Sequence, residues 1–483
     1  MFKFLEKNPV LIKLFSFFYL VFANTSLIVA INLISLILSI FTLNSCKSIR
    51  FSFVHFLRYI SVKTLNVYYY ALKYCKIDIS KWSIAIIKIA LTLVPGGCTL
   101  PFFLAIDDTL VEKFGEHFEG VSSLFDHTSR NGTSYLHGHC FVCLIMIFPI
   151  SVGGNFIYIR VPIGYRIWIP AKREKAKNTD KKQKKSKQKS LNAQANNENE
   201  KTKLKIAAEL LELAYSVLGS ERTIVVLADS WYPKGPVRNF IKEHKNVAGI
   251  FNVRKDTALY DLPEKTGKRG RPDKYGKKIS IEDDFEFIDV PETDFRIGYR
   301  KVVTHLFGGD IVCMAVVTEA RDSGSKRLFL CTDPEKSTID IRHITDPNVR
   351  AFGEAVKEVL CFCPYCFRWG IEVTFLEQKS HWGLGDYMLR SITGIERWIN
   401  LQTVAYASLC LLPYFDEAFA GLRDLSIQER RYEVGRLIQR QLFYGDLIIG
   451  LKDDPKNEVL VTHCEEIARK ETLRFDSKGK TGS

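Results

Sequence analysis

The sequence predicts an α/β fold with a β-rich insertion and an α-helical N-terminal region. Three observations favour this class. Strand patterns alternate with helical patterns from about residue 99, two of the strand patterns end in aspartates, and a block of short strand patterns interrupts the alternation. The 483 residues are 46% hydrophobic and 25% charged. This composition indicates several domains with buried cores and excludes a wholly disordered chain.

Residues 1–98 form the expected α-helical N-terminal region. Residues 14–46 carry no charged side chain, and an apolar run of this length could supply one or two membrane spans. Polar residues interrupt the run, however, and Leu27, Ile31 and Ile34 recur at helical spacing, which also suits a helix buried in protein. We expect buried helices used for DNA binding or dimerisation, with a membrane anchor as the alternative.

Residues 99–254 predict the order strand, strand, strand, helix, strand, helix, strand. The first strand pattern ends at Asp107 and Asp108, and the fourth ends at Asp229. Parallel strands joined by helices place ligand groups at their carboxyl ends, so aspartates from two strands could converge on one point. Adjacent strand residues face opposite ways, so only one of Asp107 and Asp108 can take part.

The positive charge is concentrated in residues 171–205. The whole chain has a net charge of +14, and this segment holds 13 Lys and Arg against 4 Asp and Glu, a difference of +9. Its composition predicts a flexible, solvated loop. The loop either attracts phosphate groups or is a tolerated surface insertion. The basic excess favours a polyanionic partner, either nucleic acid or an acidic membrane surface.

Residues 255–355 predict the β-rich insertion, because Gly, Pro and charged residues separate short strand patterns there. Arg269 and Arg271 stand in the sequence Arg-Gly-Arg-Pro, the core of a motif whose arginines enter an A·T-rich minor groove. The plainer interpretation is a basic turn that touches only the DNA backbone.

Residues 356–450 return to a helical pattern and contain an unusual set of polar residues. On an α-helix Tyr365, Arg368, Glu372 and Lys379 would occupy one narrow stripe. A tyrosine, two cations and a carboxylate on one face suit contact with phosphates and a metal. A solvated helix face with an Arg–Glu pair is the alternative. Residues 451–483 are expected to form a polar tail.

The spacing Y-x2-R-x3-E-x6-K of these four residues resembles the signature of bacterial insertion-sequence DDE transposases. The sequence IDDT resembles the first-aspartate motif of that family, in which the acid before the threonine is the ligand, here Asp108. The sequence LADSWYPKG resembles the second-aspartate motif and implies Asp229. The resemblance covers about residues 100 to 412 and implies an RNase H-like core that carries a β-rich insertion.

The resemblance also implies the reaction and its participants. Asp108, Asp229 and Glu372 would hold two Mg²⁺ ions, for which Mn²⁺ could substitute, and the enzyme would cleave DNA at transposon ends and transfer the freed strand to target DNA. Paired divalent ions held by carboxylates activate the attacking oxygen and stabilise the leaving one. Tyr365, Arg368 and Lys379 would contact the transposon end. One expected partner is double-stranded DNA, which includes the inverted-repeat ends and the target. The other is a second copy of the chain in the synaptic complex. The expected location is the bacterial cytoplasm, at the nucleoid.

Two alternatives stay open. Another RNase H-like nuclease would cut DNA without joining it, and a membrane-anchored protein would use residues 14–46 as spans.

His137 and His139 share one strand face and could approach the acids, although structural roles are the plainer interpretation. Cys361, Cys363 and Cys366 lack the fourth ligand that a structural zinc site needs.

Overall fold

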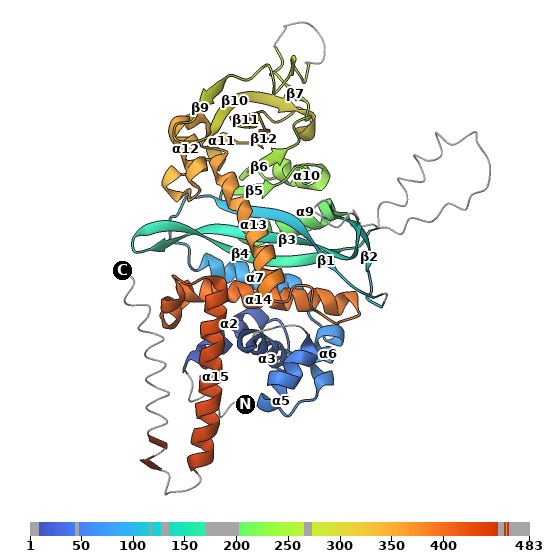
Figure 1. Cartoon of the computed structure of the whole chain (residues 1–483), viewed down its shortest axis with the longest axis vertical. Helices are drawn as coiled ribbons and strands as arrows, with labels where there is room; N and C mark the ends of the chain where they lie inside the picture. Colours follow the sequence, from blue (N-terminus) through green and yellow to red (C-terminus); the bar gives the residue numbers. More distant parts are fainter. Residues whose placement is uncertain are drawn as a thin grey trace, which may run out of the picture.

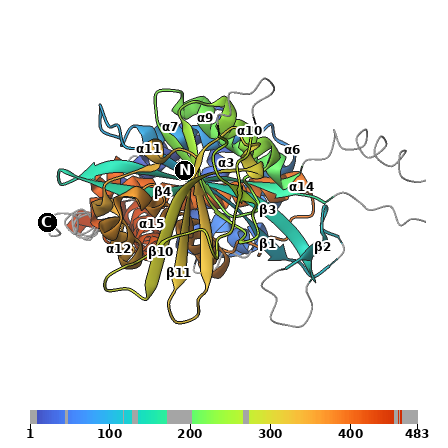
Figure 2. The same cartoon turned by 90° about the horizontal axis from the view of Figure 1, so that it is seen from above.

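The protein is described by a computed structural model, shown from two directions in Figures 1 and 2. The structure describes residues 9–43, 48–115, 117–126, 135–170, 202–264, 273–452, 458–459 and 461–462. The sequence predictions for Arg269, Arg271 and most of the basic segment, residues 171–201, lie outside these ranges.

The N-terminal region is helical, as predicted. Its helices are α2 (Pro9–Phe22), α3 (Leu27–Thr42), α4 (Ile49–Ser52), the π-helix η1 (Phe53–Leu57), α5 (Arg58–Ile60), α6 (Leu65–Tyr74) and α7 (Ile79–Leu91). The apolar run is therefore split between two short helices joined by a turn. Nearly all of α3 is buried, and it packs against two helices from the far end of the chain, α14 (Ile392–Phe415) and α15 (Ile427–Lys452).

Among the described residues, one helical run is long and apolar enough to cross a membrane, Lys357–His381. That run is interrupted by a 3-10 segment, and it carries Arg368 and Glu372, which are paired with each other. Long apolar helices in protein cores pass the same test of length and composition. The apolar helices Leu11–Phe22 and Leu27–Thr42 are shorter than a span.

The core follows the predicted order, with one additional short strand. Its strands are β1 (Phe102–Glu112), β2 (Ser122–Phe125), β3 (Tyr135–Val152), β4 (Asn155–Trp168), β5 (Ile224–Ala228) and β6 (Val247–Val253), and its helices are α9 (Lys203–Leu218) and α10 (Gly235–Glu243). The turn between β3 and β4 is made by Gly153 and Gly154, whose φ angles are 58° and 82°. Two residues with positive φ match the twist of a hairpin, and glycine adopts them without strain.

The sheet is mixed. β3 runs antiparallel to β1 and to β4, whereas β5 is parallel to β1 and β6 is parallel to β5. Helix α13 (Trp369–His381) contacts β1, whereas α9 contacts β3 and β4 and α7 contacts β4. Figure 1 shows α13 crossing in front of the strands, with α14 and the N-terminal helices below them. The sheet therefore separates α13 on one face from α7 and α9 on the other.

Helix α14 protects the outer strand β4. Asn400 receives a hydrogen bond from the backbone N–H of Tyr165 at 3.0 Å and donates one to its carbonyl oxygen at 2.9 Å. Glu396 accepts a hydrogen bond from the N–H of Ile167 at 3.0 Å. These side chains occupy backbone groups that would otherwise be open to pairing with another strand.

The insertion is β-rich, as predicted. Its elements are β7 (Leu259–Tyr260), β8 (Lys278–Ile279), β9 (Phe287–Asp289), β10 (Phe295–Thr304), η2 (His305–Phe307), β11 (Cys313–Ala320), β12 (Lys326–Cys331), α11 (Pro334–Ser337), η3 (Ile341–His343), α12 (Pro347–Ala355) and η4 (Lys357–Val359). β12 pairs antiparallel with β6, so among the described residues core and insertion share one 12-stranded sheet. In Figure 2 the strands β10 and β11 run across the direction of β3 and β4, as expected from accumulated twist.

The second part of the core departs from the prediction that Tyr365, Arg368, Glu372 and Lys379 share one α-helix. Residues Cys363–Arg368 form a 3-10 helix, η5, and α13 begins only at Trp369. The chain then breaks at Gly383 and Gly385, which have φ angles of 71° and 113°, before α14 begins. The 3-10 helix η6 (Glu417–Leu422) and α15 complete the described fold.

Candidate active site

The pairing of β1 with β5 brings two aspartates together. Ala105 of β1 lies opposite Leu227 of β5 in the parallel register. Asp107 and Asp229 each stand two residues after these paired positions. Residues opposite each other in a parallel pair share a face of the sheet. Asp107 and Asp229 therefore lie side by side just beyond the paired residues of β1 and β5, on the face that α13 covers. The first strand does not end at the aspartates as predicted, because β1 continues along β3 to Glu112.

Arg368 connects this pair of acids to a third carboxylate. Its guanidinium donates a hydrogen bond to Asp107 Oδ2 at 2.6 Å and another to Glu372 Oε1 at 2.7 Å. The adjacent Phe367 packs edge-on against Phe103 of β1, with ring centroids 5.2 Å apart. This aromatic contact holds η5 against the sheet and so brings Arg368 to Asp107.

The carboxyl group of Asp107 is buried close to other acidic side chains, and this changes its pKa. Burial raises the pKa of Asp107 from 3.8 to about 7, and the charges of Asp229 and Asp108 act in the same direction. The positive charge of Arg368 opposes this rise. A carboxylate in such surroundings is stabilised by any additional cation that binds beside it.

Asp108 does not join this group. Its Oδ2 accepts a hydrogen bond from Lys203 Nζ at 2.7 Å, and its Oδ1 accepts one from the Tyr232 hydroxyl at 3.0 Å. Lys203 belongs to α9, on the opposite face of the sheet from Arg368. The structure thus departs from the expectation for Asp108, because the alternation of β1 turns Asp107 towards α13 and Asp108 towards α9.

The predicted stripe of four residues is divided in the structure. Tyr365 is half-buried beside Arg368, and its hydroxyl donates a hydrogen bond to the carbonyl oxygen of Ala228 at 3.4 Å, directly before Asp229. Lys379 is exposed near the far end of α13, where it interacts with Asp126. Tyr365, Arg368 and Glu372 therefore stand at the acids, whereas Lys379 stands further along the helix.

The other carboxylate of this part of α13 has separate partners. Glu377 accepts a hydrogen bond from the Tyr406 hydroxyl and lies 3.9 Å from Arg160. Glu372 is the acid of α13 that faces Asp107 through Arg368.

The donor chemistry of the cluster suits a hard divalent ion, because carboxylate oxygens are the ligands such ions prefer. In the part of the chain that the structure describes, however, no group of three or more His, Cys, Asp or Glu side chains has the geometry to hold a metal ion. Arg368 lies between Asp107 and Glu372 and occupies the space in which an ion shared by both would bind. Asp107 and Glu372 would hold an ion between them only if Arg368 moved away from one of them.

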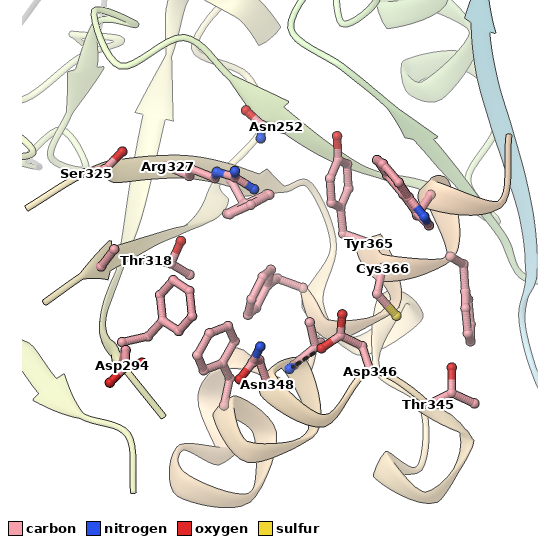
Figure 3. Close-up of a pocket in the computed structure, with 18 of the residues that line it drawn as sticks. Asn252, Asp294, Thr318, Ser325, Arg327, Thr345, Asp346, Asn348, Tyr365 and Cys366 are labelled. Carbon is pink, nitrogen blue, oxygen red and sulfur yellow. Dashed lines mark hydrogen bonds between the residues drawn. The ribbon is translucent and has the colours of Figure 1, made fainter. Parts of the chain in front are cut away.

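A pocket of about 910 Å³ opens beside the acid cluster (Figure 3). Its walls come from the strands of the insertion, from α12 and from η5, and Figure 3 shows Arg327 of β12 and Tyr365 of η5 among the residues that line it. Aromatic rings from several elements line it: Phe295, Phe329, Phe352, Phe362, Tyr365, Phe367 and Trp369. Trp369 follows Arg368 directly and is 64% exposed. Sequence reasoning did not identify Trp369, although its place next to the signature arginine was a usable signal.

The remaining predicted residues have structural partners. His139 is buried and forms hydrogen bonds with the Tyr387 hydroxyl at 2.7 Å and with the carbonyl oxygen of Glu119 at 3.0 Å. This supports its structural interpretation. Cys361 and Cys363 are buried free thiols, and no metal-binding group among the described residues includes them.

One family comparison bears on this site. Residues 76–293 match the family model described as "DDE superfamily endonuclease". The matched segment contains β1 and β5 with Asp107, Asp108 and Asp229, and it ends before the signature helix. No curated protein matches the chain significantly. The match supports a DDE-type endonuclease, a class that generally cleaves DNA with the help of divalent metal ions.

Proposed function

We propose that this chain is a DDE-type DNA endonuclease that acts as a transposase, with Asp107, Asp229 and Glu372 as its catalytic acids. The observation that carries the proposal is the gathering of these carboxylates around Arg368, where the parallel pairing of β1 with β5 ends. Two of the three acids lie in the segment similar to DDE superfamily endonucleases.

The sheet topology supports an RNase H-like core. Three antiparallel strands, β4, β3 and β1, continue into two parallel strands, β5 and β6, with helices on both faces. The signature helix α13 crosses β1 next to the first acid. This mixed α/β arrangement is compatible with the RNase H-like core that the resemblance to insertion-sequence transposases implies.

All three acids would take part in binding metal ions in the proposed mechanism. Asp107 and Asp229 would hold divalent ions between them, and Glu372 would complete the site from α13. Bound there, two Mg²⁺ ions, or Mn²⁺ in their place, would activate the attacking oxygen and stabilise the leaving oxygen. Arg368 neutralises the acids in the present arrangement and would turn to a DNA phosphate, to which its guanidinium can donate two parallel hydrogen bonds.

The residues around the acids supply the DNA contacts in this proposal. Tyr365 is held next to Asp229 by its hydrogen bond to Ala228 and would contact the DNA end. Trp369 presents an exposed ring at the rim of the pocket, where a base could stack on it. Lys379 would bind a phosphate further along the strand.

The acids are tested by conservative substitution. Asp107→Asn, Asp229→Asn and Glu372→Gln should each abolish cleavage of DNA that carries the inverted repeats flanking the reading frame, because each removes a carboxylate charge. Binding of the same DNA, measured by gel shift, should persist. Glu377→Gln is the matched control, since Glu377 lies on the same helix but pairs with Tyr406 and Arg160. Full cleavage by the Glu372→Gln variant would remove Glu372 from the site.

Strand transfer needs its own assay, because an endonuclease that does not join DNA would share the same acids. Incubation of the wild-type chain with pre-cleaved ends and a target plasmid should give end-joined plasmid. Cleavage without any joined product would favour the RNase H-like nuclease alternative. The mass of the protein complex on paired ends should correspond to two copies of the chain.

A further inference from the structure

A second polar cluster lies behind the acids, on the opposite face of β1. It is centred on Asp108, whose carboxylate accepts hydrogen bonds at both oxygens. The Tyr232 hydroxyl donates to Oδ1 at 3.0 Å, and Lys203 Nζ and the Cys140 thiol donate to Oδ2 at 2.7 and 3.2 Å. These three protein donors take up three of the about four acceptor positions of a carboxylate.

Tyr232 belongs to the turn that carries Asp229. The backbone N–H of Tyr232 donates to the carbonyl oxygen of Asp229 at 3.3 Å, and the N–H of Trp231 donates to Asp229 Oδ1 at 3.0 Å. Tyr232 is 1% exposed. Its buried hydroxyl joins the turn to β1 through the hydrogen bond that it donates to Asp108.

Lys203 neutralises the charge of Asp108. It is the first residue of α9, and its ammonium also lies over the ring of Trp168 at 4.8 Å from the centroid. Asp107 and Asp108 are neighbours in sequence, and each has one cation, Arg368 on one face and Lys203 on the other. The repulsion that Asp108 would otherwise exert on the acid cluster is thereby reduced.

We propose that Asp108 is a positioning residue of the nuclease site, which acts through Tyr232 to fix the turn that presents Asp229 to Asp107. The inference rests on the proposed function, because it assigns Asp108 a task in the same reaction. It explains why β1 carries two consecutive aspartates just beyond its pairing with β5. One faces the reacting groups, and the other holds the second acid in register with the first.

The test compares the loss of two tyrosine hydroxyls. Tyr232→Phe keeps the buried ring and removes only the hydrogen bond to Asp108. Tyr215→Phe is the matched control, because the Tyr215 hydroxyl bonds Asn246 at 3.0 Å near the start of β6, at the other end of the strands. We expect Tyr232→Phe to lower kcat for DNA cleavage by about 10- to 100-fold, the usual effect of removing an outer partner of a ligand. The KM for DNA should stay unchanged, and Tyr215→Phe should keep the wild-type kcat.

Substitution of the two aspartates separates their roles. Asp108→Asn keeps an oxygen that can accept the Tyr232 hydrogen bond, so it should retain measurable cleavage, whereas Asp107→Asn should retain none. The inference is overturned if Tyr232→Phe cleaves at the wild-type rate, or if Tyr215→Phe loses as much kcat as Tyr232→Phe. Loss of cleavage in Asp108→Asn but not in Asp107→Asn would overturn it while leaving the nuclease function intact. A wild-type chain that cleaves no DNA would overturn the function and the inference together.

Discussion

Arg368 is the residue on which the geometry of the acid cluster depends. Its side chain is 12% exposed and binds Asp107 of β1 and Glu372 of α13 at the same time. Lysine could not replace it here, because a single ammonium group lacks the planar fork that reaches two carboxylates. The same fork suits a phosphate, so under the proposed function Arg368 would exchange the acids for a DNA phosphate.

Trp369 provides a residue-scale prediction for DNA binding. Its ring is 64% exposed next to Arg368, so Trp369→Ala should fold normally but lose a base-stacking surface. Stacking of one base on an aromatic ring contributes about 1–3 kcal/mol, so the Kd for the DNA end should rise about 10-fold or more. Fluorescence anisotropy measures this Kd. Met388→Ala, which removes another exposed apolar side chain, is the control and should bind like the wild type.

An unchanged Kd in Trp369→Ala would mean that the ring does not contact DNA. The pocket behind it would then need another explanation.

Lys113 provides a residue-scale prediction for pH dependence. It is 6% exposed and donates hydrogen bonds to the carbonyl oxygens of Gly385 and Tyr387. Burial lowers the pKa of Lys113 from 10.5 to about 8, against the opposing charge of Asp386. Between these two values the unfolded chain holds a proton on Lys113 that the folded chain has released, so Lys113 makes stability rise with pH in this window.

The variant Lys113→Met isolates this contribution. The difference in unfolding free energy between wild type and variant should shift in favour of the wild type from about pH 8 to about pH 10. Urea denaturation at several pH values measures it. Parallel pH profiles for the two proteins would contradict the lowered pKa.

At the scale of the element, the signature segment shows what spacing alone can and cannot predict. Tyr365 and Arg368 lie in a 3-10 helix, in which residues three apart are eclipsed, so both still face the acids. Glu372 lies one turn into α13 and is reached by Arg368. Lys379 is too far along the axis to join them. The α-helical stripe thus predicted the angular grouping of the four residues but not their separation along the helix.

The contact between α15 and α3 provides an element-scale prediction. Gly435 of α15 lies so close to α3 that a Cβ there would come within 2.2 Å of the carbonyl oxygen of Phe41. Gly435→Ala should therefore push the helices apart and destabilise the protein by about 1–3 kcal/mol, the usual effect of overpacking. Urea denaturation gives the change. Tyr432→Ala, at an exposed position of the same helix, should leave stability nearly unchanged. Equal stability of Gly435→Ala and the wild type would show that this contact is looser than described.

At the scale of the whole molecule, the order of core elements and the β-rich insertion were predictable, because each depends on local periodicity and turn residues. The choice between Asp107 and Asp108 was not. Alternation showed that only one could face the site, but the deciding fact is which face α13 covers, and that is set by packing such as Phe367 against Phe103. The pairing of β12 with β6 could not be predicted from the sequence either, because a strand pattern does not specify which strand it pairs with.

The buried N-terminal helices lead to a prediction for the whole protein. Leu33, Leu36 and Ile37 of α3 are fully buried against protein, so most of α3 is already covered. The basic chain should therefore associate with cell material mainly through charge, and about 1 M salt should release it, since salt screens such contacts. Cell fractionation followed by immunoblotting measures this. Retention of the chain in membranes until detergent is added would favour the membrane-anchored alternative.

The strand pair β6–β12 makes the insertion a rigid extension of the catalytic core. An accessory domain on a flexible tether can swing to meet its substrate, but one joined through a ladder of backbone hydrogen bonds can only bend or twist with the strands it continues. The shared sheet then fixes the distance from the aromatic pocket to the acids. DNA held at both places must adopt the spacing that the protein dictates, and any distortion this requires falls on the DNA.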